Sequence, residues 1–294
     1  NEQMYIKVAN GEAYDILIPS DYMIERLKQE KLIQPLDQDK ITCLDDINDA
    51  VKNLSYDPNN EYSVPYFWGS VGIVYDKTKV SEKDLKEQGF NIFLNQKYKG
   101  DIYLYDSERD SFMMALKALG YSMNTDNEKE LEEAYNWLLG CVNTMSPEIV
   151  TDEIIDNMAQ ARKAFGLIYS GDAAYAMSEN ENVGYYMPNK GTNIWCDAMV
   201  IPQSSKHVDL AHEFINYVSS YEAAYDNSSY VGYTSPNTEV MNDLQQNDFK
   251  GINAYNPIRN NKYDEVFNYN AETRKIMANY WKKVKIAASN ANNQ

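Results

Sequence analysis

Two spacings of apolar residues alternate along the chain, and they predict short strands and amphipathic helices in turn. Apolar residues spaced three and four apart predict helices, as where Leu131, Ala134, Tyr135 and Leu138 form one stripe. Runs rich in β-branched and aromatic residues predict strands. Strands are expected at residues 14–19, 64–76, 101–106, 183–188 and 196–202, helices at 1–11, 21–32, 107–121, 127–142, 152–165, 208–218 and 270–285, and a strand, a glycine turn and a helix within 166–177.

This alternation of strands and helices predicts an α/β protein with largely parallel sheets. A length of 294 residues suggests two domains, and no linker-like tract separates them. We therefore expect two lobes and a chain that crosses between them more than once. Asn1 and Ser20 are expected to cap the first two helices, and Gly69 and Gly72 to interrupt the apolar run at 64–76.

Polar and aromatic residues gather at the expected carboxyl ends of the strands, where open parallel sheets bind ligands. Trp195 and Asp197 lie two apart on one strand, so their side chains share a face, while Cys196 and Ala198 take the other face. A carboxylate that faces a core without a partner is costly, which favours a binding role for this pair. The other strand-end residues are Ser20 and Tyr22, residues 106–110, and Tyr169, Ser170 and Asp172.

The excess of acidic over basic residues indicates which kinds of ligand or macromolecule the protein can bind. The chain has 27 Lys and Arg against 44 Asp and Glu, a formal net charge of -17, which repels nucleic acid and anionic membranes and attracts cationic ligands. Solvation of an acidic surface is the alternative explanation for this excess. No run approaches the roughly 20 apolar residues that a membrane-spanning helix needs.

The sequence offers no pattern for a metal, a cofactor or a catalytic group. Cys43, Cys141 and Cys196 form no CxxC pair and are expected as buried thiols. His207 and His212 are five apart at the start of a helix, and both are expected on the surface. Nucleophile-elbow, HExxH, P-loop and GxGxxG motifs are absent. We therefore predict no cofactor, no metal and no catalytic residue.

Five segments, in order along the chain, resemble the spermidine/putrescine-binding proteins of bacterial ABC importers. They are YDILIPSDYMIERL (14–27), DPNNEYSVPYFWGSVGIVYD (57–76), RDSFMMALKALGYS (109–122), IWCDAMVIP (194–202) and VGYTSPN (231–237). The resemblance implies a two-lobed solute-binding protein of the type II periplasmic fold, which closes on a polyamine in a cleft between its lobes and delivers it to the permease subunits. It also implies an exported protein, in the periplasm or held at the extracellular face of the membrane by a lipid anchor on an N-terminal segment. We expect a monomer.

Carried over onto this sequence, the resemblance assigns ligand binding to residues of five motifs, and it implies how the chain passes through the two lobes. We expect lobe 1 to comprise residues 1–72 and 196–237, and lobe 2 residues 73–195 and 238–294. The implied ligand-binding residues are Ser20 and Tyr22 of the first turn, Ser107 and Asp110 of the acidic turn, Tyr169 before the SG turn, Trp195 and Asp197 of the late strand, and Tyr233 of the GYTSPN turn.

Three departures from the family pattern bear on this assignment. Ser107 stands where some members have a second aspartate, and Phe267 stands where some have a ligand-binding glutamine. The family's opening strand has no counterpart, so we expect that an N-terminal segment of one inner strand and a helix is missing from this chain.

The residue types suit a polyamine, since carboxylates pair with its spaced ammonium groups and aromatic faces pack on its methylenes. Structural roles are the alternative at each position: Trp195 as core, Ser20 and Asp110 as helix caps, and Tyr22 and Tyr233 as half-buried tyrosines. Three other functions stay open. The same fold could bind another small cationic or neutral solute, the chain could be a sensor or adhesion domain, or paired carboxylates could hydrolyse glycosides.

Overall fold

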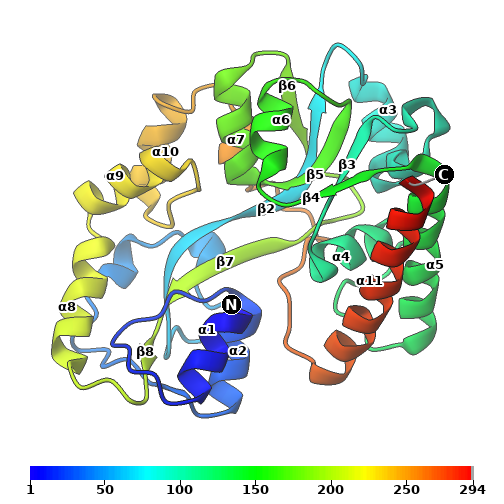
Figure 1. Cartoon of the computed structure of the whole chain (residues 1–294). Helices are drawn as coiled ribbons and strands as arrows, with labels where there is room; N and C mark the ends of the chain where they lie inside the picture. The colour runs from blue at the N-terminus through cyan, green and yellow to red at the C-terminus, as the bar shows by residue number, and fades with distance from the viewer. Residues whose placement is uncertain (293–294) are drawn as a thin grey trace. The chain divides into compact units, whose positions relative to one another are not determined.

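The computed structural model describes residues 1–292, and the chain divides into two compact units. Both units contain helices and strands (Figure 1). The chain passes repeatedly from one unit to the other, as expected. Unit 1 comprises Asn1–Gly69, Trp195–Gly251 and Val266–Tyr269, and unit 2 comprises Ser70–Ile194, Ile252–Glu265 and the residues from Asn270 onward.

The units differ from the expected lobes mainly after residue 237. Helix α10 (Thr238–Gln246) belongs to unit 1, where it packs against α9 (Tyr221–Val231). The segment Val266–Tyr269 also belongs to unit 1, and its last amide donates to Glu25 Oε2 at 2.6 Å. The second of these contacts joins residues 244 positions apart, so the order of elements along the chain could not predict it. The divisions expected at 72/73 and 195/196 fall after Gly69 and Ile194.

Unit 1 is built around short strands and a helix that covers them. β1 (Ile33–Gln34) pairs antiparallel with β8 (Ile201–Pro202), and α8 (Val208–Val218) packs its apolar side on a core that includes Val64 and Met199. Apolar spacing predicted α8 correctly because this side is buried. The remaining elements of unit 1 are α1 (Glu2–Ala9), α2 (Asp21–Gln29), the 3-10 helices η1 (Cys43–Asp46) and η2 (Asp49–Val51), and β7 (Ile194–Met199) from its second residue onward.

The strand expected at residues 14–19 is wrong. This stretch forms only one isolated bridge, between Leu17 and Val200. Pro19 has no amide hydrogen to donate, and its carbonyl accepts from the Ala198 amide at 3.0 Å. A continuous ladder of backbone hydrogen bonds therefore does not form here.

The burial of the three cysteines was predicted correctly from the sequence, whereas the burial of one histidine was not. Cys43, Cys141 and Cys196 are buried free thiols, as predicted, and burial raises the pKa of Cys141 to about 12. His212, expected on the surface, is 2% exposed, and its Nε2 accepts from the Asp37 amide at 2.9 Å. The helix that carries His212 packs this side inward, so a polar side chain there needs a buried partner.

Unit 2 is built on a mixed sheet with the strand order β4–β3–β5–β2–β6 (Figure 1). β3 (Ile102–Tyr105) is parallel to β4 (Glu148–Val150) and β5 (Phe165–Tyr169), whereas β2 (Val64–Asp76) is antiparallel to β5 and to β6 (Val183–Tyr186). The expectation of largely parallel sheets is therefore wrong for β2. Helical connections predict parallel pairing between consecutive strands, but β2 pairs with strands that follow much later in the chain.

Strand β2 is continuous over 13 residues, where the sequence predicted an interruption at its glycines. A Cβ added at Gly72 would lie 2.5 Å from the ring of Tyr185 on β6. The glycine therefore makes room for this ring, whose hydroxyl is 3.0 Å from Ser70 Oγ in a hydrogen bond.

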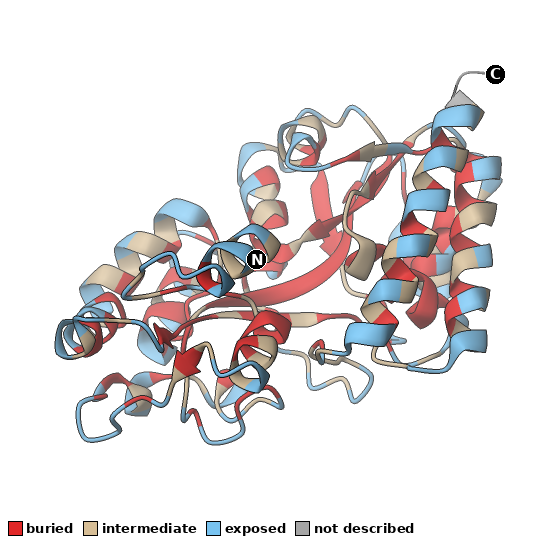
Figure 2. Ribbon diagram, turned by 60° about the horizontal axis from the view of Figure 1, so that its bottom comes forward, coloured by how far each residue is buried: buried red, intermediate tan, exposed pale blue. Residues whose placement is uncertain are grey.

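Three helices of unit 2, α4 (Glu108–Leu119), α5 (Glu128–Met145) and α11 (Ala271–Asn292), pack together (Figures 1 and 2). α5 buries the stripe predicted from its spacing, with Leu131 and Leu138 fully buried. Figure 2 shows the exposed residues of α5 and α11 on their outer sides and the strands largely buried. The other elements of unit 2 are α3 (Glu82–Gln88), η3 (Gly89–Leu94), η4 (Gln96–Tyr98), α6 (Glu153–Ala159), α7 (Ser170–Glu179) and η5 (Asn253–Tyr255).

The helix expected at residues 152–165 is shorter than predicted. α6 ends at Ala159, and Ala161 has a φ of 52°, a left-handed conformation that a helix cannot continue through. Phe165 already belongs to β5. Of the apolar residues at the end of this stretch, Phe165 is therefore buried as part of a strand.

Candidate functional site

Four of the expected ligand-binding residues meet in unit 1, and we call Ser20, Trp195, Asp197 and Tyr233 the Asp197 cluster. Ser20 Oγ donates to Asp197 Oδ1 at 2.6 Å, and the two residues form an antiparallel backbone bridge. Trp195 is two residues before Asp197 on β7, so both side chains point to the same side of the strand. The cluster combines a carboxylate, a hydroxyl that orients it and an indole ring.

Ser20 occupies the N-cap position of α2, but its side chain does not cap the helix. The hydroxyl donates to Asp197, and its oxygen accepts from Asn1 rather than from an amide of the helix. Asn1, expected to cap α1, also turns its side chain to Ser20: its Oδ1 accepts from the Ser20 amide at 2.9 Å, and its Nδ2 donates to Ser20 Oγ at 3.0 Å. Asp21 joins α2 to β7, with Oδ2 accepting from the Cys196 amide at 3.1 Å. Asn1 and Ser20 are therefore the N-cap residues of their helices, as expected, but neither side chain makes the capping hydrogen bond. Both side chains fix the turn beside Asp197 instead.

The aromatic part of the Asp197 cluster is a chain of edge-to-face rings. The centroids of Trp195 and Tyr233 are 5.1 Å apart at 63° between planes, and those of Tyr233 and Phe67 are 5.9 Å apart at 87°. Trp195 is 7% exposed, and Tyr233 is half-buried. Such contacts hold each ring in one orientation, which leaves a defined aromatic surface beside the carboxylate.

Tyr22, the remaining expected residue of unit 1, is 4% exposed. Its hydroxyl donates to Glu2 Oε1 of α1 at 3.3 Å. The structure therefore places Tyr22 against the first helix, and its role as a ligand contact stays a prediction.

The other three expected residues meet in unit 2, and we call Ser107, Asp110, Tyr169 and their neighbour Asn193 the Asp110 cluster. Ser107 is the N-cap of α4: its Oγ accepts from the Asp110 amide at 3.3 Å and donates to Asp110 Oδ2 at 2.7 Å. Tyr169, at the end of β5, donates its hydroxyl to the same Oδ2 at 2.6 Å. Asn193 Nδ2 donates to Asp110 Oδ1 at 3.5 Å. The ring of Tyr169 also packs edge-on against Tyr105, with centroids 5.2 Å apart.

Burial sets the electrostatics of the Asp110 cluster. Asp110 is 3% exposed, and its hydrogen-bond partners within residues 1–292 are all neutral donors. Burial, followed by the charge and the hydrogen bond of Asp110, raises the pKa of Tyr169 well above 10.0, so its phenol stays a donor. A buried carboxylate with neutral partners is best stabilised by a cation, which makes this cluster suited to a positively charged ligand.

The model of a family described as bacterial extracellular solute-binding protein matches residues 6–250. The chain belongs to this family. The expected family is therefore confirmed.

Relatives of this solute-binding protein carry polyamine names. It is 29% identical over 290 residues to the spermidine/putrescine-binding periplasmic protein of Escherichia coli, an alignment that covers 97% of this chain and 82% of that protein. The protein of the same name from Salmonella typhimurium is 30% identical over 242 residues, covering 81% of this chain and 68% of that one.

Solved structures confirm the α/β fold class expected for a solute-binding protein. The spermidine/putrescine ABC transporter substrate-binding protein PotD from Streptococcus pneumoniae, in complex with calcium and HEPES, superposes with a TM-score of 0.84 at 36% identity, covering 98% of this chain and 88% of that one. A putative spermidine/putrescine ABC transporter protein from Listeria monocytogenes gives 0.83 at 32% identity, covering 97% and 88%. Both match the two-lobed type II fold that the resemblance implied.

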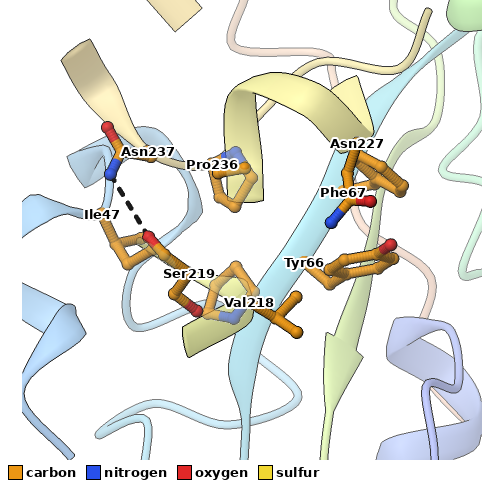
Figure 3. Close-up of a pocket in the computed structure, with 10 residues that line it drawn as sticks. Ile47, Tyr66, Phe67, Val218, Ser219, Asn227, Pro236 and Asn237 are labelled. Atoms are coloured by element: carbon orange, nitrogen blue, oxygen red, sulfur yellow. Dashed lines mark hydrogen bonds between the residues drawn. The ribbon is translucent and has the colours of Figure 1, made fainter. Parts of the chain in front are cut away.

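A small pocket lies beside the aromatic rings of unit 1 in this solute-binding protein (Figure 3). Figure 3 shows Tyr66 and Phe67 on one side of it and Ser219 and Asn237 on the other, with Asn237 Nδ2 donating to the Ser219 carbonyl at 3.4 Å. Its volume of about 10 Å³ is close to that of one water molecule. No carboxylate lines it, so this pocket holds no charged partner for an ammonium group.

Several residues near the clusters have other partners or were not predicted. Asp106 of the expected acidic turn accepts from Trp281 Nε1 at 2.9 Å and pairs with Lys285 at 3.1 Å, so it fastens α11. Phe267 is 5% exposed in unit 1. Asn193 was missed because an asparagine before a strand gives no signal in a single sequence.

Within residues 1–292, no group of three or more His, Cys, Asp or Glu side chains is arranged to hold a metal ion. The same residues contain no helix long and apolar enough to cross a membrane.

Proposed function

We propose that this protein binds a polyamine and delivers it to the permease subunits of an ABC importer. The observation that carries the proposal is that each unit holds a buried or half-buried carboxylate close to aromatic rings. These are Asp197 with Trp195 in unit 1, and Asp110 with Tyr169 in unit 2. The relatives named for spermidine and putrescine support the same class of ligand.

The chemistry of a polyamine fits both clusters. An ammonium about 4 Å from a carboxylate gains about 4 kcal/mol at an intermediate dielectric, much of it offset by desolvation of both groups. An aromatic face adds about 0.5–2 kcal/mol when it packs against a cation or the methylenes beside it. Hydrogen bonds from Ser20, Ser107 and Tyr169 orient the carboxylates in advance, which reduces the cost of ordering them on binding.

We further propose that the two units are the two lobes of the binding protein and that it works as an exported monomer without catalysing a reaction. The periplasmic location in the names of its relatives supports export. The protein would then be located in the periplasm or at the outer face of the cell membrane. Attachment by a lipid anchor is proposed from the family resemblance alone. Light scattering of the purified protein tests the monomer, with a mass of about twice 33.8 kDa as the contradicting result.

Isothermal titration calorimetry tests the ligand directly. We expect micromolar binding of at least one of putrescine, spermidine and spermine, and no heat of binding with glutamate or maltose. Asp110→Asn should weaken the best ligand at least tenfold, about 1.4 kcal/mol. Binding of maltose or glutamate without any polyamine would show that the clusters serve another solute.

A further inference from the structure

The position of Asn193 is fixed through its backbone. Its carbonyl accepts from the Val71 amide at 3.0 Å, and Asn193 forms a parallel bridge with Glu265. Thr192, the preceding residue, donates its hydroxyl to the Val71 carbonyl. The side chain of Asn193 is 3% exposed and sits in unit 2 next to Asp110. These backbone contacts fix where the Asn193 side chain leaves the chain, and burial holds that side chain beside Asp110.

The orientation of the Asn193 amide follows from the charge of its neighbour. Nδ2 is the atom 3.5 Å from Asp110 Oδ1. A flipped amide would place Oδ1 against the carboxylate, acceptor against acceptor, so the observed orientation is the favoured one. In this orientation Asn193 Oδ1 is buried and has no hydrogen-bond partner among residues 1–292.

An amide oxygen buried without a donor costs free energy that a hydrogen-bond partner would recover. The nearest carboxylate, Asp110, has one oxygen already occupied by two hydroxyls, from Ser107 and Tyr169. Asp110 Oδ1, which accepts only from Asn193 in the part of the chain that the structure describes, and Asn193 Oδ1 therefore both have acceptor capacity left.

We propose that Asn193 is a further ligand-binding residue, whose Oδ1 accepts an N–H from the ammonium group that pairs with Asp110. This inference rests on the polyamine function proposed above and deepens it. An ammonium with two or three N–H donors can bond Asp110 Oδ1 and Asn193 Oδ1 at once. The chemical class selected at this position is a primary or secondary amine, because a quaternary ammonium has no N–H to donate.

The first test is the affinity of Asn193→Leu, which keeps the approximate volume of the side chain and removes both of its polar atoms. We expect putrescine and spermidine to bind about tenfold more weakly than to the unchanged protein, as for the loss of a hydrogen bond to a charged group. The matched control is Asn180→Leu, also in unit 2. Asn180 Nδ2 donates to the Ala159 carbonyl at 2.9 Å and its Oδ1 accepts from the Asn182 amide at 2.9 Å. This control should lower the melting temperature and leave affinity unchanged.

The second test is a crystal structure of the unchanged protein with putrescine, which does not depend on how any variant folds. A ligand nitrogen within about 3.2 Å of Asn193 Oδ1 supports the proposal. A water molecule in that place, with the ligand nitrogen elsewhere, overturns it.

The outcomes separate this inference from the proposed function. If the unchanged protein binds no polyamine, the polyamine function is wrong. If it binds polyamines and Asn193→Leu binds them equally well, only the role of Asn193 is wrong.

Discussion

Ser20 and Ser107 show how much a side chain's role depends on its nearest acceptor. Both precede a helix, and both donate to a carboxylate, Asp197 and Asp110 respectively. Only Ser107 also caps its helix, because the carboxylate it bonds belongs to the first turn of that helix. For Ser20 the carboxylate comes from a residue 177 positions later, and the serine oxygen accepts from Asn1 Nδ2 in place of a helix amide. At both places the serine hydroxyl serves to orient a carboxylate.

The first prediction concerns Asp197, the carboxylate of unit 1. Asp197→Asn keeps the size of the side chain and removes its charge, so we expect the dissociation constant for the best polyamine to rise at least tenfold, about 1.4 kcal/mol. Calorimetric titration measures the change. The matched control is Asp209→Asn on α8, whose side chain is 83% exposed and paired with Lys40, and which should bind as before. Equal affinities for Asp197→Asn and the unchanged protein would remove Asp197 from the site.

The chemistry of the candidate site could be read from residue types, but its hydrogen bonds could not. Alternation along a strand correctly placed Cys196 and Ala198 on a fully buried face, and family resemblance brought in Tyr233. The hydrogen bond between Ser20 and Asp197 joins distant segments, and the free acceptor on Asn193 depends on which way one amide points. Such details are set by tertiary packing, which local propensity does not encode.

The helices and strands show the same difference. Features set by neighbouring residues were predicted, and features set by distant residues were not. Helices α5 and α8 matched their apolar spacing closely, because their buried sides are continuous over several turns. The stretch at 14–19 has strand-like composition but lacks a continuous partner, and β2 takes its antiparallel direction from strands more than 80 residues later. Strand pairing is a long-range property, so its direction and extent are the least predictable features.

The second prediction tests how closely β2 and β6 pack. In Gly72→Ala the new methyl group would lie 2.5 Å from the Tyr185 ring, so we expect the free energy of unfolding to fall by about 1–3 kcal/mol. The matched control is Gly140→Ala inside α5, where a Cβ meets nothing within 4 Å. That change should stabilise the protein by about 0.5–1 kcal/mol, since alanine favours a helix. Urea unfolding of both variants gives the comparison, and destabilisation of equal size in the two would contradict it.

The third prediction concerns the loop that ends at Glu265. Burial acts to raise the pKa of Glu265, but hydrogen bonds from Lys117, Ser122 and the Met123 amide outweigh it and lower the pKa below 4.5. A carboxylate with a lowered folded-state pKa stabilises the fold above its unfolded pKa, and this stability disappears as the pH falls through the folded value. Lys117 is nearly buried, so its loss of a charged partner is costly.

The expected result is that Glu265→Gln lowers the free energy of unfolding by about 1–3 kcal/mol at pH 7. The difference between Glu265→Gln and the unchanged protein should shrink as the pH falls below 4.5, because the protonated glutamate also loses its charge. Denaturant unfolding at pH 7 and at several acidic values measures both effects. A difference that is constant with pH would show that the charge of Glu265 does not stabilise the loop.

At the scale of the whole molecule, the net charge of -17 acts on every approaching cation. An acidic surface raises the local concentration of polycations and speeds their association, and under the proposed function the carboxylates of the two clusters then hold the bound polyamine. The two effects respond differently to salt, because exposed charges are screened more strongly than buried ones such as Asp110.

The last prediction follows from that difference. Raising the ionic strength from about 0.1 M to about 1 M shortens the Debye length from about 10 Å to about 3 Å. We expect the dissociation constant to rise at least about threefold for putrescine and more for spermidine, which carries an additional amine. Stopped-flow fluorescence of the tryptophans, read against salt, should show most of this change in the association rate. Affinities that do not vary with salt would mean that apolar contacts with rings such as Trp195 dominate binding, and the acidic surface would then serve solvation alone.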